Sequence, residues 1–342
     1  MRAAFFIGAN LLLGALLLGW VLYRFGGPAL GVLTANPSPS MLLAFLGLVA
    51  ATLALFAWRW RFLLAGLFPP PGLAKLCLFR SAGHSVGAIV PSARLGGDPL
   101  RAWLAVRAGV APDAAIAGVA ADRTLEIGAA TPFSVVFILM LLQSGVPQLD
   151  RVLITVLLGT AGLVVGVALA VRRLRRGQGL VTALIRSARL DRLRVVRDSL
   201  DVAAAAERAI ARLQAQTRRL GVAFCAGLAA NLLVLVEYTA LLAAFDLPTT
   251  PLTVVAAVFA TSAAHLLPVP GGVGVLEGGT TWLFGMLGHP PEVGLAVGLA
   301  LRLRELVWLL PGLVFLLAQV PRSWLGAAPP DQSDDGEPAT PL

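Results

Sequence analysis

Long uninterrupted runs of apolar residues dominate the chain, and their lengths predict its secondary structure. A helix needs about 20 residues to cross the roughly 30 Å of hydrocarbon in a bilayer. Runs of that order occupy residues 4–23, 40–58, 114–142, 151–171, 220–244 and 292–319. The pattern therefore predicts an all-α, polytopic membrane protein with about six full spans.

Two further apolar regions, residues 74–108 and 251–288, are interrupted in the middle by proline and glycine. Proline lacks an amide donor and glycine loosens the backbone, so a helix ends at such a break and another begins after it. Halves of about 14 to 18 residues suit re-entrant hairpins, which enter the membrane and return to the same side. If each half instead crossed the membrane completely, the predicted orientation of the protein would be the same. The breaks contain Pro91, Gly96 and Gly97 in the first region and Pro268, Pro270, Gly271 and Gly272 in the second.

The two interrupted regions are followed by the same landmarks at the same spacing. A glycine comes first, then a proline three residues later, an acidic residue, an arginine and a glutamate. The matched pairs are Gly109 and Gly288, Pro112 and Pro291, Asp113 and Glu292, Arg123 and Arg302, and Glu126 and Glu305. This spacing predicts an internal repeat over about 40–142 and 220–319. The two copies are expected to have inverted topology, as in many secondary transporters, with the broken helices meeting near the bilayer midplane.

Composition and charge agree with a membrane protein and indicate its orientation. Of 342 residues, 58% are hydrophobic and 13% charged, with a mean hydropathy of +0.83, which the surface of a soluble domain would not tolerate. Residues 172–219 alone carry a net charge of +9, equal to the formal charge of the whole chain, and such basic segments stay in the cytoplasm. This segment predicts an amphipathic helix on an anionic lipid surface, and no nucleic-acid partner is expected.

The ends of the chain are both expected on the cytoplasmic side of a bacterial inner membrane. Arg2 and the pair Arg59 and Arg61 are assigned to that side by the positive-inside rule. The first apolar run has no convincing cleavage site, so it is interpreted as a retained span. Residues 321–342 are rich in proline and acidic residues. They are expected to form a disordered cytoplasmic tail after a transmembrane domain of residues 1–320.

Several motifs give no support to catalysis or to a cofactor. Cys77 and Cys225 stand singly in apolar runs, so neither a disulfide nor a metal site is expected. The segment Gly83-His-Ser85-Val-Gly87 fits G-x-S-x-G, but a nucleophile elbow needs a strand before the serine. Glycines four residues apart in an apolar helix instead favour close helix packing. No nucleotide-binding P-loop is present.

The stretches at residues 89–126 and 266–313 resemble the lysylphosphatidylglycerol synthase transmembrane region family, which is also described as flippase-like membrane proteins. The resemblance runs over roughly residues 5–320 and implies movement of a lipid or a lipid-linked head group between leaflets. Some members carry a soluble aminoacyl-transferase domain after the membrane part; residues 321–342 are too few for one, so synthase activity is not expected here. Stand-alone relatives are associated with phospholipids, hopanoids or lipid carriers. The residues that carry the resemblance are Pro91, Gly97, Asp98, Arg101, Asp122, Arg123, Glu126, Pro268, Pro270, Gly271, Gly272, Gly274 and Glu277.

The candidate substrate site is built from charges within the apolar spans. Arg123 with Glu126, and Arg302 with Glu305, lie one helical turn apart and can lower each other's burial cost. The two arginines are expected to hold a lipid phosphate in a central cavity, because a planar guanidinium binds phosphate through two hydrogen bonds. The alternative is a pair of structural ion pairs that lock the hairpins.

Three more charges, Arg94, Asp98 and Arg101, stand at or just past the first break. They are candidate ligands for a head group entering from the cytoplasmic leaflet, aided by the start of the second half-helix. They fit equally well an interfacial cap in which Arg101 reaches to lipid phosphates. The depth of the residues in the membrane decides between these two interpretations.

Proton or cation coupling is assigned to Glu277, His84 and His265. Glu277 lies deep in an apolar run, and the two histidines precede the two breaks, where an imidazole can relay protons near neutral pH. The alternative for each histidine is a hydrogen bond to a neighbouring carbonyl group. Asn231 and Glu237 either line the same cavity or bond to a neighbouring helix.

The function expected is that of a lipid flippase working by alternating access, without catalytic activity. The expected partners are membrane lipids with anionic head groups, while a homo-oligomer and association with lipid-synthesis enzymes are left open. The first alternative is a membrane-embedded lipid-modifying enzyme that uses His84, Ser85 or His265. The second is a non-transporting accessory subunit of lipid synthesis.

Overall fold

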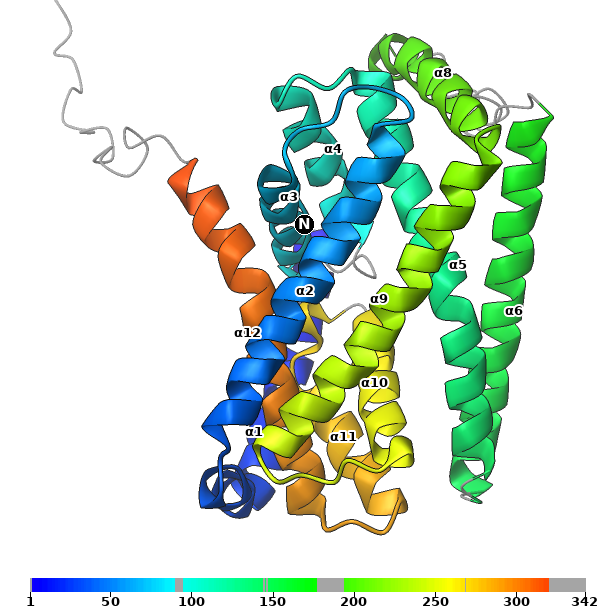
Figure 1. The fold of residues 1–342 in the computed structure, drawn as a ribbon. Coiled ribbons are helices and arrows are strands. Elements are labelled where there is room, and N and C mark those ends of the chain that lie inside the picture. The colour runs from blue at the N-terminus through cyan, green and yellow to red at the C-terminus, as the bar shows by residue number, and fades with distance from the viewer. Residues whose placement is uncertain are drawn as a thin grey trace, which may run out of the picture.

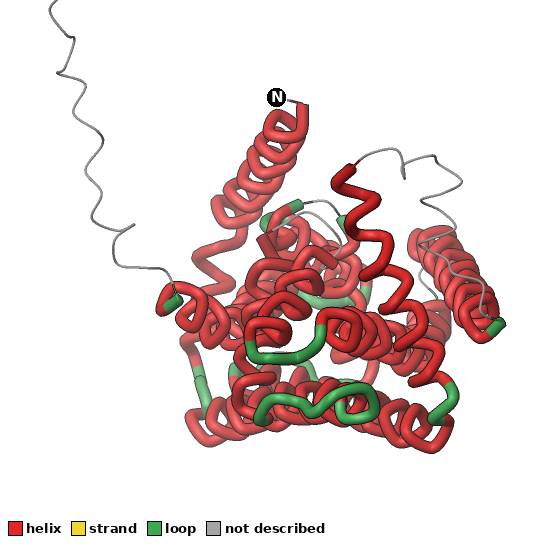
Figure 2. Tube along the Cα trace, turned by 90° about the horizontal axis from the view of Figure 1, so that it is seen from above, coloured by secondary structure: helices red, strands yellow, loops and turns green. Residues whose placement is uncertain are grey.

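The protein is a bundle of α-helices, seen in a computed structural model (Figure 1). The structure describes residues 2–89, 95–143, 145, 147–176, 194–267 and 269–319. Figure 2 shows helices, turns and no strand over these residues. The helices are α1 (Arg2–Ala35), α2 (Pro39–Leu64), α3 (Leu73–Ile89), α4 (Asp98–Arg107), α5 (Pro112–Gln143), α6 (Pro147–Arg175), α8 (Arg194–Gln214), α9 (Thr217–Ala244), α10 (Pro251–Leu266), α11 (Val275–Met286) and α12 (Pro291–Ala318), with short 3-10 turns at Leu95–Gly97 and Pro270–Gly272.

The prediction of an all-α, polytopic membrane protein is confirmed. In the described part of the chain, five segments are long and apolar enough to cross a membrane: Ala15–Ala35, Pro39–Leu64, Pro112–Gln143, Asp150–Leu174 and Thr217–Ala244. Helix α12 has 28 residues, which is also enough to cross about 30 Å at 1.5 Å per residue. It carries three charged residues in its middle, Arg302, Arg304 and Glu305.

The first two helices extend beyond their predicted ends at residues 23 and 58. Helix α1 continues through Pro28 to Ala35, and α2 continues to Leu64. Arginine is a good helix former, so the basic residues that end an apolar run do not end the helix. Arg59, which the positive-inside rule assigned to the cytoplasmic side with Arg61, does not lie in an exposed loop: it belongs to α2, and its side chain lies inside the bundle with 0% of its surface exposed.

The two interrupted regions form two pairs of short helices at opposite ends of the bundle. Figure 1 shows α3 and α4 in the half that α8 covers, and α10 and α11 in the other half. The four helices have 17, 10, 16 and 12 residues. At 1.5 Å per residue their lengths are about 26, 15, 24 and 18 Å. Helices α4 and α11 are thus shorter than the predicted halves, because the turns take up residues on both sides of each break.

The turns at the breaks depend on glycine. Gly271 and Gly272 have φ values of 62° and 58°, a left-handed conformation that glycine adopts without steric cost. Gly97 lies against the backbone of Gly83, so a Cβ atom at position 97 would collide with the carbonyl group of Gly83. The break residues Pro91 and Pro268 lie outside the described part of the chain.

The helices of the two predicted repeats correspond at a nearly constant offset. Helices α9, α10, α11 and α12 begin 177 to 179 residues after α2, α3, α4 and α5. An offset of 179 residues also pairs Arg123 with Arg302 and the two prolines inside α5 and α12, Pro132 and Pro311. The same offset pairs Pro91 with Pro270 and not with Pro268.

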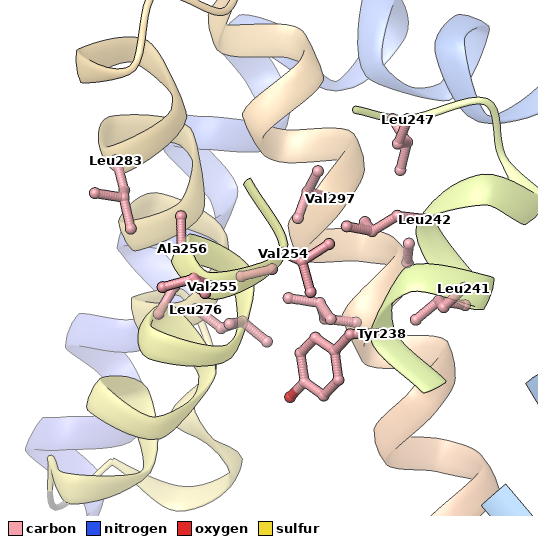
Figure 3. Close-up of a cluster of buried hydrophobic side chains, with 14 of the residues drawn as sticks. Tyr238, Leu241, Leu242, Leu247, Val254, Val255, Ala256, Leu276, Leu283 and Val297 are labelled. Carbon is pink, nitrogen blue, oxygen red and sulfur yellow. The ribbon is translucent and has the colours of Figure 1, made fainter. Parts of the chain in front are cut away.

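Each pair of short helices packs in its own apolar core. One cluster joins α2, α3, α4 and α5 through residues such as Trp60, Leu76 and Leu104. A larger cluster contains residues of α1, α9, α10, α11 and α12, together with some from α2, α5 and α6. Figure 3 shows Tyr238 and Leu241 of α9 and Val254 of α10 in this cluster. Helix α6 stands at the edge of the bundle and packs on α5 and α8 (Figure 1). Between the two cores, some polar residues of both halves face a common space, among them Arg123 and Arg304.

Candidate functional site

A cavity of about 460 Å³ lies between the two halves of the bundle. Its size falls within the range of small-molecule sites, about 300–1,000 Å³. Its walls come from α2, α3, α4, α5, α9, α10 and α12. The arginines, histidines and carboxylates in the wall are Arg80, His84, Asp98, Arg101, Arg123, Glu126, His265 and Arg304.

Asp122 joins the helices of the first half behind this wall. Its side chain is 0% exposed and accepts hydrogen bonds from Arg59 of α2 (2.8 Å), Arg80 of α3 (2.8 Å) and Arg101 of α4 (2.7 Å). A carboxylate can be buried this way because paired charges and hydrogen bonds replace its hydration. Asp122 therefore holds three arginines in place around one side of the cavity.

Glu126 and Asp98 hold the same arginines from the cavity side. Glu126 lies 2.5 Å from Arg80, 3.2 Å from Arg59 and 3.1 Å from Arg123. Asp98 lies 3.1 Å from Arg101 and 2.9 Å from Arg123. Both carboxylates bridge two or more guanidinium groups, and the network fixes the first hairpin to α2 and α5.

Arg302 organises the second hairpin in a separate network. It donates to Glu277 at 2.6 and 3.1 Å, to Glu305 at 2.6 Å, and to the carbonyl oxygens of Gly271 and Gly272 at 2.5 and 2.8 Å. Glu277 also accepts a bond from the amide of Gly274 at the start of α11 (2.9 Å). This guanidinium therefore supplies hydrogen-bond donors to two carbonyl groups of the break that lie outside regular α-helix.

The two networks share one bonding pattern around their matched arginines, Arg123 and Arg302. In each, Nε donates to a carboxylate 25 residues earlier in the chain and Nη1 donates to a glutamate three residues later. The bonding pattern thus repeats along with the helix order. The networks differ in position, since Arg123 lines the cavity and Arg302 is not among the residues of its wall.

A third group of charged residues joins α9 to α12 beside the cavity. Nε of Arg304 lies 2.5 Å from Glu237, which is 0% exposed and accepts a bond from the indole nitrogen of Trp308 (3.2 Å). The Arg304 guanidinium also lies 4.7 Å from the ring centroid of Tyr238, within cation–π distance. Glu237 therefore bonds to a neighbouring helix, while Asn231 lines the cavity.

The two histidines assigned to proton coupling both line the cavity. The His84 ring lies 5.6 Å from the ring of Trp308. Nε2 of His265 lies 2.5 Å from Glu305, so this histidine connects the cavity to the network around Arg302. Their role in coupling stays a prediction.

The serine of the G-x-S-x-G match packs against α12. The Ser85 hydroxyl donates to the carbonyl oxygens of Ser81 (2.9 Å) and Leu309 (2.8 Å). The Ser81 hydroxyl donates to the carbonyl oxygen of Trp308 (2.7 Å). Pro311 lacks an amide hydrogen and weakens the helical bonds around it, which serine hydroxyls can compensate. Ser85 is 1% exposed and is absent from the cavity wall.

The structure brings together most of the predicted site residues in two groups. Asp98, Arg101, Arg123, Glu126, His84 and His265 line the cavity. Arg302, Glu305 and Glu277 form the network of the second hairpin. Arg94 lies outside the described residues. The interfacial-cap interpretation of Arg101 does not fit, because its side chain is 4% exposed and bonds to Asp122.

Sequence reasoning missed Arg59, Arg80, Asp122 and Arg304 as members of the site. Arg80 is the only charged residue in the sequence between Lys75 and Arg94, and isolated charges in apolar segments are site candidates by default. That signal could have found Arg80. Nothing in the sequence distinguished the buried Arg59 from Arg61, which bonds to the Pro71 carbonyl oxygen near the end of α2.

The fold and the site define a polytopic α-helical membrane protein with an arginine-rich internal cavity. The chain belongs to the lysylphosphatidylglycerol synthase TM region family, whose pattern matches residues 7–312. Membership indicates a membrane protein of lipid biosynthesis or lipid flipping. No curated protein sequence matches the chain.

Proposed function

We propose that this protein moves lipids with a phosphate-bearing, anionic head group between the two leaflets of a membrane. The observation that carries the proposal is the cavity between the two halves, whose wall contains four arginines and two carboxylates, a net charge of +2 with both histidines neutral. Guanidinium groups bind phosphate oxygens in pairs. The acyl chains would stay in the bilayer while the head group occupies the cavity.

The arrangement of the short helices supports alternating access. None of the four, at about 15 to 26 Å, is long enough to span roughly 30 Å of hydrocarbon, so we interpret both pairs as re-entrant hairpins. They enter from opposite ends of the bundle (Figure 1), and α3 contacts the second break at Pro270–Gly272. Inverted repeats with broken helices around a central site are the architecture of many secondary transporters.

The proposed orientation places α8, and the loops at its end of the bundle, in the cytoplasm of a bacterial cell. Helix α8 lies within the basic segment 172–219, and the positive-inside rule assigns such segments to the cytoplasm. The first hairpin then opens from the cytoplasmic side and the second from the outside. Both termini are proposed to be cytoplasmic.

In the proposed cycle, the head-group phosphate competes with carboxylates for the arginines of the wall. Arg123 is bonded to Asp98 of α4 and Glu126 of α5. A phosphate that takes over part of this bonding would weaken the link between the first hairpin and α5. His265 and Glu305 connect the cavity to Arg302 and Glu277, and we propose that this route conveys the change to the second hairpin.

We propose transport and not catalysis. The hydroxyl of Ser85 already donates to backbone carbonyl groups in the contact with α12, which leaves it poorly placed as a nucleophile. His84 and His265 line the cavity, and among the wall residues Ser262 is the one serine or cysteine that they could activate. Its hydroxyl already donates to the carbonyl oxygen of Val258 at 2.9 Å.

A leaflet-resolved assay tests the proposal. The purified full-length chain is reconstituted into vesicles containing a trace of acyl-labelled phosphatidylglycerol, and a membrane-impermeant reductant quenches the label in the outer leaflet. The wild type should make the inner-leaflet label accessible. Arg123→Gln should slow this step at least ~10-fold, since a charge-assisted bond to phosphate is worth about 1.5–3 kcal/mol.

Arg212→Gln is the matched control for this assay. Arg212 lies in α8 with a side chain 64% exposed, paired with Asp113 at 3.5 Å and away from the cavity wall. It should transport like the wild type. Vesicles in which the wild type moves no labelled lipid, or in which both variants match the wild type, would overturn the proposed function.

A further inference from the structure

We propose that the cavity selects against head groups that carry an amine, and takes an anionic head group whose remaining atoms are uncharged. This inference rests on the proposed function and concerns the specificity of the same site. The carboxylates and aromatic rings of the wall are the groups that could bind a cation. The protein's own arginines already interact with them, which leaves a lipid amine without a binding partner of its own.

The carboxylates of the wall have no oxygen without a guanidinium partner. The two oxygens of Asp98 bond to Arg101 (3.1 Å) and Arg123 (2.9 Å). One oxygen of Glu126 bonds to Arg123 (3.1 Å), and the other to Arg80 (2.5 Å) and Arg59 (3.2 Å). A lipid ammonium group would have to share each of these carboxylate oxygens with a guanidinium, which already offsets the negative charge of the carboxylate.

The aromatic rings of the wall are engaged in the same way. Phe56 lies 4.4 Å from the guanidinium of Arg80 and 5.1 Å from that of Arg59. Tyr238 and Trp308 lie 4.7 and 5.6 Å from the guanidinium of Arg304. Aromatic faces are the usual site for quaternary ammonium groups, and each of these three rings already has a cation beside it.

The same wall contains groups that can bind a phosphate anion and groups that can bind the uncharged hydroxyls of a head group. Nε of Arg101 is buried and has no hydrogen-bond partner among the residues that the structure describes, so it is a donor that a phosphate oxygen can satisfy. The hydroxyls of Thr261 and Ser262 donate to backbone carbonyls of α10. Their oxygens retain lone pairs that can accept bonds from the hydroxyls of a polyol.

The ammonium of an amine head group therefore meets a wall with more arginines than carboxylates, in which each carboxylate is already paired with arginine. A phosphodiester with a glycerol remainder brings a single negative charge into a wall of net charge +2. An ethanolamine head group brings the same phosphate plus an ammonium that must lie near several guanidinium groups. A lysyl ester of phosphatidylglycerol adds two ammonium groups and becomes cationic. We expect the rate of movement to fall in this order, with at least a 10-fold difference between the first and the last.

The experiment compares three lipids with the same labelled acyl chain in vesicles of one host composition. The lipids are phosphatidylglycerol, phosphatidylethanolamine and lysylphosphatidylglycerol, each assayed with wild-type protein and with empty vesicles. Protein-dependent movement of phosphatidylglycerol at least 10-fold faster than of lysylphosphatidylglycerol supports the inference. Equal rates, or a faster amine-bearing lipid, overturn the inference and leave the proposed function standing. Movement of none of the three overturns the proposed function itself.

A specificity variant gives a second readout that does not depend on the absolute rate. Arg123→Gln frees one oxygen of Asp98 and one of Glu126 from their guanidinium partner. The ratio of lysylphosphatidylglycerol to phosphatidylglycerol movement should rise at least 5-fold in this variant and stay at the wild-type value in Arg212→Gln. An unchanged ratio in Arg123→Gln would show that the carboxylates do not control the selection against amines.

Discussion

Replacing Asp122 with asparagine removes the central counter-charge of the arginine network without changing the size of the side chain. In the native protein this carboxylate binds Arg59, Arg80 and Arg101 at 2.7 to 2.8 Å, and it is fully buried. Each arginine keeps one other carboxylate after the change, since Glu126 also contacts Arg59 and Arg80, and Asp98 contacts Arg101. The network is therefore weakened and not abolished.

The expected loss of stability can be worked from these contacts. Breaking a buried ion pair by removing one partner costs about 3–5 kcal/mol. Because the three arginines keep a second partner, we expect the lower end of this range, about 3 kcal/mol. At roughly 2–4 °C per kcal/mol for a sizeable domain, the apparent melting temperature should fall by about 6–12 °C.

The assay is size-exclusion chromatography of the detergent-solubilised, fluorescently tagged protein after heating, which reports the fraction still monodisperse at each temperature. Asp113→Asn is the matched control, because Asp113 pairs at 3.5 Å with an arginine that is 64% exposed. Exposed pairs contribute about 0–1 kcal/mol. If the two variants melted within 2 °C of each other, Asp122 would not organise the network as argued.

Three further predictions concern the breaks and the packing of the hairpins. Gly97→Ala should abolish the monodisperse peak, because the added Cβ atom collides with the backbone of Gly83. Gly271→Ala should lower stability by about 1 kcal/mol and reduce transport, because its φ of 62° is unfavourable for alanine. Ser85→Ala should change transport less than 2-fold, because its hydroxyl serves the contact with α12, and loss of all activity would favour the enzyme alternative.

The helical spans were predictable because hydrocarbon leaves a backbone few choices. A segment in the membrane must satisfy its own amide and carbonyl groups, so apolar length alone predicts a helix. The breaks at Gly96 and Gly97 and at Pro270 to Gly272 were also readable, since proline and glycine act locally. The helix ends were less accurate, as α2 shows, because the run of apolar residues ends before the helix does.

The members of the site were only partly predictable. Arg123 and Arg302 were selected through the repeat in the sequence, and both have the same bonding pattern in the structure. Their places differ, since only Arg123 lines the cavity. Arg59 belongs to the network although its surroundings in the sequence resemble those of a basic loop. Hydropathy averages over a window and does not report which way a single arginine points.

The sequence by itself determined the membrane-spanning helices, the two interruptions and the paired positions of the repeat, because each depends on local chemistry or on spacing along the chain. Only the tertiary structure decided which charges meet. Asp122 gathers arginines from α2, α3 and α4, which are 63, 42 and 21 residues away in the sequence. Burying those charges is favourable only when all of these helices pack together, so the arginine-rich cavity is a property of the fold and not of any one segment.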